Sequence, residues 1–260
     1  MLGLRILTAT FGIPVVVLLI YLGGWVLTGG VAILAAIGVV EIARMFRSRG
    51  IVFYPWLTVV WVWSIMAAVG LGRGLVPVLV LGAAVVAIVS LLSSPQESFQ
   101  GAVTTTWVAV YLGLFFSYLP MIRHLVHGQV FAYVFFAVIW ATDTTAFFVG
   151  RQWGRHKLMP RVSPGKTWEG TVAGAVSGVV VAGGAFWFLH LVVWHALLFG
   201  FTVSIVGQIG DLLESAIKRY TGVKDSGSLL PGHGGVLDRF DSSLLALPIA
   251  YYLLIGLGIH

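Results

Sequence analysis

Acidic side chains are rare in this chain, and most of them lie in its second half. Of the nine Asp and Glu residues, Asp211 with Glu214 and Asp238 with Asp241 form two pairs with a spacing of three. In a helix, this spacing places both members of a pair on one face. Their carboxylate oxygens are hard ligands that suit Mg²⁺ or Mn²⁺. If the two pairs converge, they predict a divalent-metal site; the alternative is ordinary helix-end charge, which the helix dipole favours for Asp at an N-terminus.

The segment between the two acidic pairs is rich in glycine and basic residues. Residues 218–235 contain five glycines, which allow the backbone to approach a ligand closely. Lys218, Arg219 and Lys224 could neutralise phosphates. Neither a Walker A loop nor a Rossmann fingerprint is present. A divalent metal beside such a segment is typical of phosphoryl or nucleotidyl transfer.

Two further polar features lie upstream. Residues 161–170 form a second basic segment, which a solvated cytoplasmic loop would also explain, and its Glu169 could be a plain helix N-terminal charge. Asp143 lies inside an apolar stretch beside Thr142, Thr144 and Thr145, which could line a wet cavity. Because charge inside a bilayer is costly, we expect Asp143 to be functional or ion-paired.

The composition predicts which elements position these residues. The chain has 260 residues, of which 59% are hydrophobic and 9% charged, with a mean hydropathy of +1.01. These values exclude a disordered chain and a soluble enzyme, and predict an all-α polytopic integral membrane protein. The net charge of +6 is better explained by membrane topology and phosphate contacts than by nucleic acid. The absence of cysteine excludes Cys nucleophiles and Cys–zinc sites.

Nine apolar stretches are candidate transmembrane helices, separated mainly by glycine-rich or Ser-Pro breaks. We interpret the first as a helix rather than a signal peptide, because no convincing cleavage site follows it. The weakest division is the one marked only by His190 and His195. The expected spans are residues 6–22, 25–42, 52–70, 75–92, 102–121, 130–149, 171–189, 196–215 and 242–259.

The basic residues predict the orientation of these spans. With a cytoplasmic N-terminus, only Arg73 and Arg123 of the 15 basic residues lie outside. The positive-inside rule therefore favours an inside N-terminus and an outside C-terminus. Two long polar segments, residues 150–170 and 216–241, then face the cytoplasm. We interpret residues 1–129 as a scaffold of about five spans and residues 130–260 as the catalytic half with about four.

Two motifs resemble the phosphatidate cytidylyltransferase (CDP-diacylglycerol synthase) family. Residues 215–241 agree with the family signature throughout, and residues 161–170 and the aspartate of the sixth span are also similar to the family. The first half is similar only in length and apolar character. The signature residues are Ser215-Ala216-Ile217-Lys218-Arg219, Lys224-Asp225, Gly227, Leu230, Pro231, His233-Gly234-Gly235 and Asp238-Arg239-Phe240-Asp241. Those of the upstream motif are Arg161, Ser163, Pro164, Lys166, Thr167, Glu169 and Gly170.

The resemblance implies the reaction of CTP with phosphatidic acid to give CDP-diacylglycerol and diphosphate. It also implies dependence on Mg²⁺ (with Mn²⁺ a possible substitute), a helical fold, a homodimer and membrane lipids as partners. A monovalent cation such as K⁺ beside the Mg²⁺ is a further expectation. Since CTP is cytoplasmic, the active site of this multi-pass protein should face the cytoplasm from the cell (inner) membrane.

These expectations assign roles to the candidate residues. We expect Asp211, Asp238 and Asp241 to hold the metal, with Asp143 and Glu214 behind them or at a second cation. Lys218, Lys224 and His233 are further catalytic candidates, and His233 is alternatively a side chain that stabilises the loop. Phosphate-binding or other substrate-binding residues are Arg161, Ser163, Lys166, Lys218, Arg219, Lys224, Asp225, His233, Gly234, Gly235 and Arg239. Asp225 could instead pair with Lys224 or Arg239.

Other functions fit the sequence less well. A CTP-dependent polyprenol or phytol kinase would use similar residues but transfer the γ-phosphoryl group. A CDP-alcohol phosphotransferase would need a D-x-x-D-G-x-x-A-R pattern, which is absent. A secondary transporter predicts repeats and midplane charges, whereas no repeat is evident here. A purely structural scaffold leaves the dense polar motifs unexplained.

Overall fold

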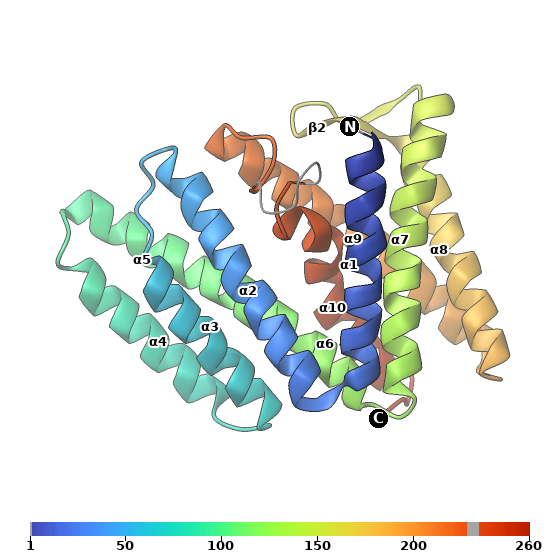
Figure 1. Cartoon of the computed structure of the whole chain (residues 1–260), viewed down its shortest axis with the longest axis horizontal. Helices are drawn as coiled ribbons and strands as arrows, with labels where there is room; N and C mark the ends of the chain where they lie inside the picture. Colours follow the sequence, from blue (N-terminus) through green and yellow to red (C-terminus); the bar gives the residue numbers. More distant parts are fainter. Residues whose placement is uncertain (1, 228–233) are drawn as a thin grey trace. The chain divides into compact units, whose positions relative to one another are not determined.

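The computed structural model describes residues 2–227 and 234–260, with side chains from residue 12 onward. Helices form most of the described chain, and one short β-hairpin interrupts them (Figure 1). The helices are α1 (Leu2–Leu22), α2 (Gly24–Arg47), α3 (Pro55–Gly70), α4 (Leu75–Ser90), α5 (Pro95–Ala109), the π-helix η1 (Val110–Leu114), α6 (Phe115–His124), α7 (Gly128–Gln152), α8 (Trp168–Phe188), α9 (Val193–Thr221) and α10 (Leu237–Gly256). The hairpin strands are β1 (Lys157–Met159) and β2 (Ser163–Thr167).

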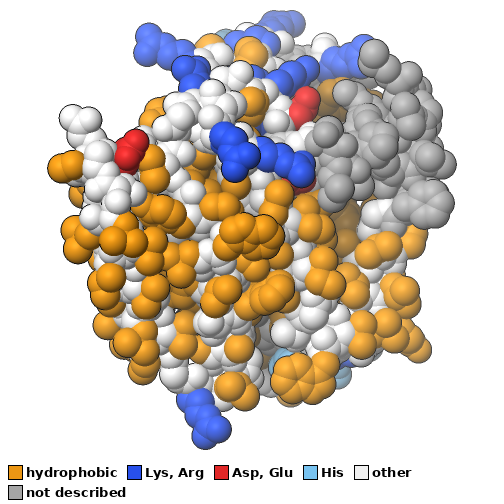
Figure 2. All heavy atoms as spheres, turned by 60° about the vertical axis from the view of Figure 1, so that its left-hand side comes forward, with side chains coloured by type: hydrophobic (Ala, Val, Ile, Leu, Met, Phe, Trp, Pro, Cys, Tyr) orange, Lys and Arg blue, Asp and Glu red, His pale blue; other side chains and the backbone are white. Residues whose placement is uncertain are grey.

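The surface and the helix lengths are those of a membrane protein. Within the part of the chain that the structure describes, five helices are long and apolar enough to cross a bilayer, namely α2, the 30-residue run from α5 through α6, α7, α8 and α9. Helices α3 and α4 and the part of α1 with described side chains (residues 12–22) are apolar as well but shorter. Hydrophobic side chains cover much of the face seen in Figure 2. Trp25 and Leu92 are among the large hydrophobic residues that are exposed. Among the described residues, each of the nine expected stretches overlaps a helical segment, although the number of spans stays a prediction.

The polar segment after α7 contains a structure that an all-α interpretation does not include. Strands β1 and β2 pair antiparallel, with Lys157 opposite Thr167 and Met159 opposite Ser163. Thr167 ends the hairpin and caps α8, because its Oγ1 accepts a hydrogen bond from Gly170 N at 3.2 Å. This cap fixes where the hairpin stops and the membrane-length helix begins.

The second polar segment is shorter than expected, because helices extend into it from both sides. Helix α9 continues to Thr221, so Lys218 and Arg219 lie in its last turn, where the helix dipole favours basic residues. Helix α10 begins at Leu237, so Asp238 lies in its first turn. Only residues 222–236 connect the two helices, and we call them the signature loop.

The chain divides into two compact units, and each unit takes segments from both halves of the sequence. Unit 1 consists of residues 1–121 and 220–239, and unit 2 of residues 122–219 and 240–260. The signature loop therefore packs with the N-terminal helices. The hairpin, α7, α8 and nearly all of α9 belong to unit 2.

Small and hydroxyl-bearing residues allow close helix packing in unit 2. Thr142 of α7 does not line a wet cavity: it is buried, and its hydroxyl lies 2.8 Å from the buried Ser204 hydroxyl of α9. Gly178 of α8 faces this pair, since a Cβ placed there would clash with Ser204 Oγ and lie 2.9 Å from Thr142 Oγ1. Glycine at this position thus allows three helices to meet around one buried hydrogen bond.

This packing predicts that Gly178→Ala destabilises the protein. The added methyl group must displace Ser204 or Thr142, and overpacking of this kind costs about 1–3 kcal/mol. Gly184→Ala in the same helix is the control, because nothing lies within 4 Å of its added Cβ. Thermal unfolding in detergent should give a lower midpoint for Gly178→Ala only; equal midpoints for the two variants would contradict the close packing.

Candidate active site

In unit 2, the hairpin is tied to α9 by an ion pair. Lys166 Nζ of β2 lies 2.8 Å from Asp211 Oδ2, and it also donates a hydrogen bond to the Gln208 carbonyl oxygen at 3.2 Å. The other oxygen of Asp211, Oδ1, accepts from Ser215 Oγ at 3.2 Å. Because both partners of the ion pair are about three-quarters shielded from solvent, the pair is screened less than one on the surface. The pair brings a residue of the upstream motif next to Asp211, which lies four residues before the signature motif.

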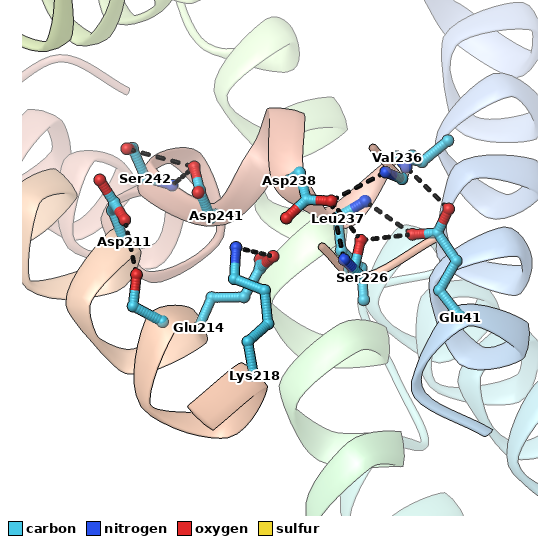
Figure 3. A network of polar contacts seen from close by, with 12 residues as sticks. Glu41, Asp211, Glu214, Lys218, Ser226, Val236, Leu237, Asp238, Asp241 and Ser242 are labelled. Carbon is cyan, nitrogen blue, oxygen red and sulfur yellow. Dashed lines mark hydrogen bonds and ion pairs between the residues drawn. The ribbon is translucent and has the colours of Figure 1, made fainter. Parts of the chain in front are cut away.

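One turn further along α9, a second ion pair is almost completely buried. Lys218 Nζ lies 3.3 Å from Glu214 Oε1, and their side chains are 10% and 3% exposed (Figure 3). The spacing of four residues within a helix brings the two side chains together. Burial of two charges is costly even when they are paired, so the pair is weak evidence for stability. It supplies an ammonium group held inside the protein.

Helix α10 adds Asp241, and α7 adds Asp143. Asp241 Oδ1 accepts a hydrogen bond from Ser242 N at 2.7 Å (Figure 3). The Ser242 hydroxyl donates to Asp143 Oδ2 at 3.2 Å. Among the side chains that the structure describes, no lysine or arginine lies within ion-pair distance of Asp143, which occupies an exposed position of its helix. Gly210 lets α10 approach α9 here, since an added Cβ would lie 2.6 Å from the Asp241 carbonyl oxygen.

These side chains form one electrostatic group, which we call the carboxylate–lysine cluster. Burial is the largest factor that disfavours a charge on the Asp241 carboxylate; the negative charges of Asp211, Glu214 and Asp143 add to it, and Lys218 partly offsets them. The cluster consists of Asp143, Lys166, Asp211, Glu214, Lys218 and Asp241. It has four carboxylates and two ammonium groups, so it has more negative than positive groups and suits the binding of a cation.

The cluster does not form a complete metal site by itself. Within residues 2–227 and 234–260, no three His, Asp or Glu side chains are arranged to hold a metal ion. Asp211 Oδ2 is already paired with Lys166. Mg²⁺ in nucleotide-dependent proteins is commonly held by one or two carboxylates together with substrate phosphates and water. The donor chemistry of the cluster fits an ion of this kind.

In unit 1, Asp238 holds the signature loop against the start of α10. Its Oδ2 accepts hydrogen bonds from Ser226 N at 2.9 Å, Ser226 Oγ at 2.9 Å and Gly235 N at 2.8 Å (Figure 3). One carboxylate oxygen therefore joins two ends of the loop that are separated by nine residues in sequence. The sequence predicted Asp238 only as a metal ligand, whereas this contact gives it a structural task as well.

Glu41 is a functional candidate that the sequence interpretation missed. This residue of α2 is 2% exposed, and its two oxygens accept hydrogen bonds from Val236 N at 2.8 Å and Leu237 N at 2.9 Å (Figure 3). The expected span of residues 25–42 places Glu41 at a helix end within the scaffold half. The sequence contains one indication of its importance, because a charged residue within an apolar stretch is costly and is usually functional or paired.

The other candidate residues are more exposed. Arg219 Nε donates a hydrogen bond to the Val162 carbonyl oxygen at 3.3 Å, which links the end of α9 to the hairpin turn. Ser163 lies half-buried in β2, Gly234 has a positive φ of 80°, and Gly235 is buried. The remaining exposed candidates are Arg161, Lys224, Asp225 and Arg239. His233 lies outside the described residues.

The fold and these contacts define a class of protein: a multi-helical membrane protein whose helices hold a cluster of carboxylates and lysines. Comparison with known families agrees with this class. The model of the cytidylyltransferase family matches residues 3–256, and the chain therefore belongs to that family.

Curated relatives are similar over part of their length. The chain is 43% identical over 168 residues to a phosphatidate cytidylyltransferase of Staphylococcus haemolyticus, with 64% of each chain covered. It is 46% identical over 157 residues to the Bacillus subtilis protein of the same name, with 57% of this chain and 56% of that one covered. The chain thus matches less than two thirds of the length of these relatives.

Proposed function

We propose that this protein transfers the cytidylyl group of CTP to phosphatidic acid, giving CDP-diacylglycerol and diphosphate. The observation that carries the proposal is the Lys166–Asp211 ion pair, which joins the upstream motif to the acidic pair on α9 within a cluster of carboxylates and lysines. Family membership and the printed names of the relatives support the same reaction.

The reaction is a direct displacement at phosphorus. An oxygen of the phosphatidate phosphate attacks the α-phosphorus of CTP, a new P–O bond forms, and the bond to the β-phosphate oxygen breaks as diphosphate leaves. The protein needs to position the two anions and neutralise their charge. Lys166 and Lys218 are the cluster's ammonium groups, and Arg161, Ser163, Arg219, Lys224 and Arg239 are proposed to bind phosphates around them. Gly234 and Gly235 let the backbone approach a phosphate.

A bound Mg²⁺ would neutralise charge on the triphosphate and its leaving group. We propose that Asp211 and Asp241 hold this ion together with CTP phosphates, because Mg²⁺ is commonly bound by only one or two protein carboxylates and by phosphates of the substrate. Asp238, one helical turn before Asp241, remains a proposed third ligand. Asp143 and Glu214 are proposed either to support these ligands without contacting the ion or to bind a second cation, for which K⁺ is a candidate.

The substrates impose a location on the site. Phosphatidic acid keeps its acyl chains in the bilayer, whereas CTP is cytoplasmic, so the signature loop and the hairpin are proposed to face the cytoplasm. The distribution of basic residues supports this orientation. A homodimer is proposed from the family resemblance alone.

The position of a radiolabel in CTP tests the reaction. The full chain in detergent receives phosphatidic acid, Mg²⁺ and CTP labelled at the α- or the γ-phosphorus. We expect α-label in the lipid extract, dependent on phosphatidic acid, and γ-label only in diphosphate. Transfer of γ-label to a polyprenol would replace the proposal with a lipid kinase. Lipid that receives neither label would contradict nucleotide transfer and favour a transporter.

A further inference from the structure

Glu41 makes the contacts expected of a residue that positions the signature loop. It comes from α2, far in sequence from the loop, yet it accepts hydrogen bonds from two consecutive amides, those of Val236 and Leu237. Leu237 is the first residue of α10. The first amides of a helix have no partner within that helix, and they favour a negative charge. Glu41 therefore caps α10 from another part of the chain.

A single hydroxyl connects this cap to Asp238. Ser226 Oγ lies 3.2 Å from Glu41 Oε2 and 2.9 Å from Asp238 Oδ2. Because a hydroxyl has one hydrogen, it donates to one carboxylate at a time. Ser226 is 3% exposed, so the bridge is shielded from water. The position of the Asp238 carboxylate thus depends on Glu41 through Ser226 and through the first turn of α10.

Two glycines show how closely the loop fits around Glu41. An added Cβ at Gly235 would lie 2.5 Å from both Glu41 oxygens, and one at Gly227 would lie 2.9 Å from Oε1. Any side chain at Gly235 would push the carboxylate away from the amides that it caps. Both glycines belong to the signature motif, so this part of the motif accommodates Glu41 as well as any ligand.

We propose that Glu41 is a positioning residue for cytidylyl transfer, which fixes the start of α10 and thereby Asp238. The expected effect on catalysis rests on the proposed function. The contacts of Glu41 with the loop and with α10 are independent of it. Glu41 lies in α2, outside both sequence motifs, and within the described residues it reaches the proposed substrate-binding groups only through Ser226 and the loop backbone.

The test compares Glu41→Gln with Glu97→Gln. In Gln, an NH₂ group replaces one of the two carboxylate oxygens, and this group cannot accept a hydrogen bond. One of the two amides, Val236 N or Leu237 N, therefore loses its acceptor. Glu97 is a matched control, because it also lies at a helix N-terminus in unit 1, where its Oε2 accepts from Ser94 N at 3.4 Å, but it is exposed. Ser226→Ala is a second variant, which removes only the bridging hydroxyl.

Two measurements are needed for each variant. The first is hydrogen–deuterium exchange of peptides that cover residues 234–240, which requires no activity. We expect faster exchange in Glu41→Gln and unchanged exchange in Glu97→Gln. The second is kcat per folded molecule, which should fall about 10- to 100-fold in Glu41→Gln, a loss typical of removing groups that orient a reacting residue. Ser226→Ala should show a smaller fall, and Glu97→Gln none.

The possible outcomes separate the inference from the proposed function. Unchanged exchange in Glu41→Gln would overturn the inference, and so would a lower unfolding midpoint with kcat unaltered. If Glu41→Gln does not fold, the inference stands or falls on kcat and exchange in Ser226→Ala. If the wild-type protein transfers no cytidylyl group while the exchange result holds, the proposed function fails but Glu41 remains the residue that fixes the loop.

Discussion

Lys166→Met should lower the rate of cytidylyl transfer about 100- to 1,000-fold, the range found when one charge-stabilising group is removed from an active site. Lys166 is the hairpin residue that reaches α9, where it pairs with Asp211 at 2.8 Å and binds the Gln208 carbonyl oxygen at 3.2 Å. Its loss removes a positive charge from a cluster that must accept two anionic substrates. It also leaves Asp211 without its lysine partner.

Lys157→Met provides the control for this prediction. Lys157 lies in the other strand of the same hairpin but is exposed. Initial rates at saturating CTP should be unaltered in this variant. A double-mutant cycle with Asp211→Asn adds a second criterion: the combined loss should be much smaller than the product of the two single losses, since both variants break one pair. Independent effects would argue against the pair as a functional unit.

Asp241→Asn should remove most of the activity without harming the fold. The Asp241 carboxylate lies under the influence of three other carboxylates, Asp143, Asp211 and Glu214. Removing one negative charge relieves repulsion, so the unfolding midpoint in the absence of divalent metal should stay level or rise. Cytidylyl transfer should fall about 100- to 1,000-fold. The repulsion among the carboxylates favours binding of a cation, so the loss of the Asp241 charge should weaken the binding of the ion that the reaction is proposed to use.

The Mg²⁺ dependence of stability distinguishes this explanation from simple misfolding. In wild-type protein, Mg²⁺ with CTP should raise the unfolding midpoint, since a ligand that binds only the folded state stabilises it. The increase should be smaller in Asp241→Asn and normal in Glu97→Gln. A full Mg²⁺ response together with wild-type activity in Asp241→Asn would remove Asp241 from the proposed cation site.

The sequence by itself determined the class of the protein and most of the helices. Long apolar runs predict membrane helices because an unpaired backbone is too costly in lipid, and the nine expected stretches overlap helical segments of the described chain. Carboxylates with a spacing of three and a glycine-rich basic loop predicted the residues that the carboxylate–lysine cluster and the signature loop contain. These signals are local in sequence, so no knowledge of packing was needed to read them.

Only the tertiary structure decided which residues meet. The Lys166–Asp211 pair joins positions 45 residues apart, and nothing in the spacing of charges distinguishes it from a pair with another carboxylate. Glu41 could not be assigned to the signature loop, because its partners are backbone amides that no sequence pattern marks. The sequence shows that a carboxylate in an apolar helix must lose hydration free energy when it is buried. It does not show which hydrogen-bond donors compensate for that loss, because those donors come from segments that are distant in sequence.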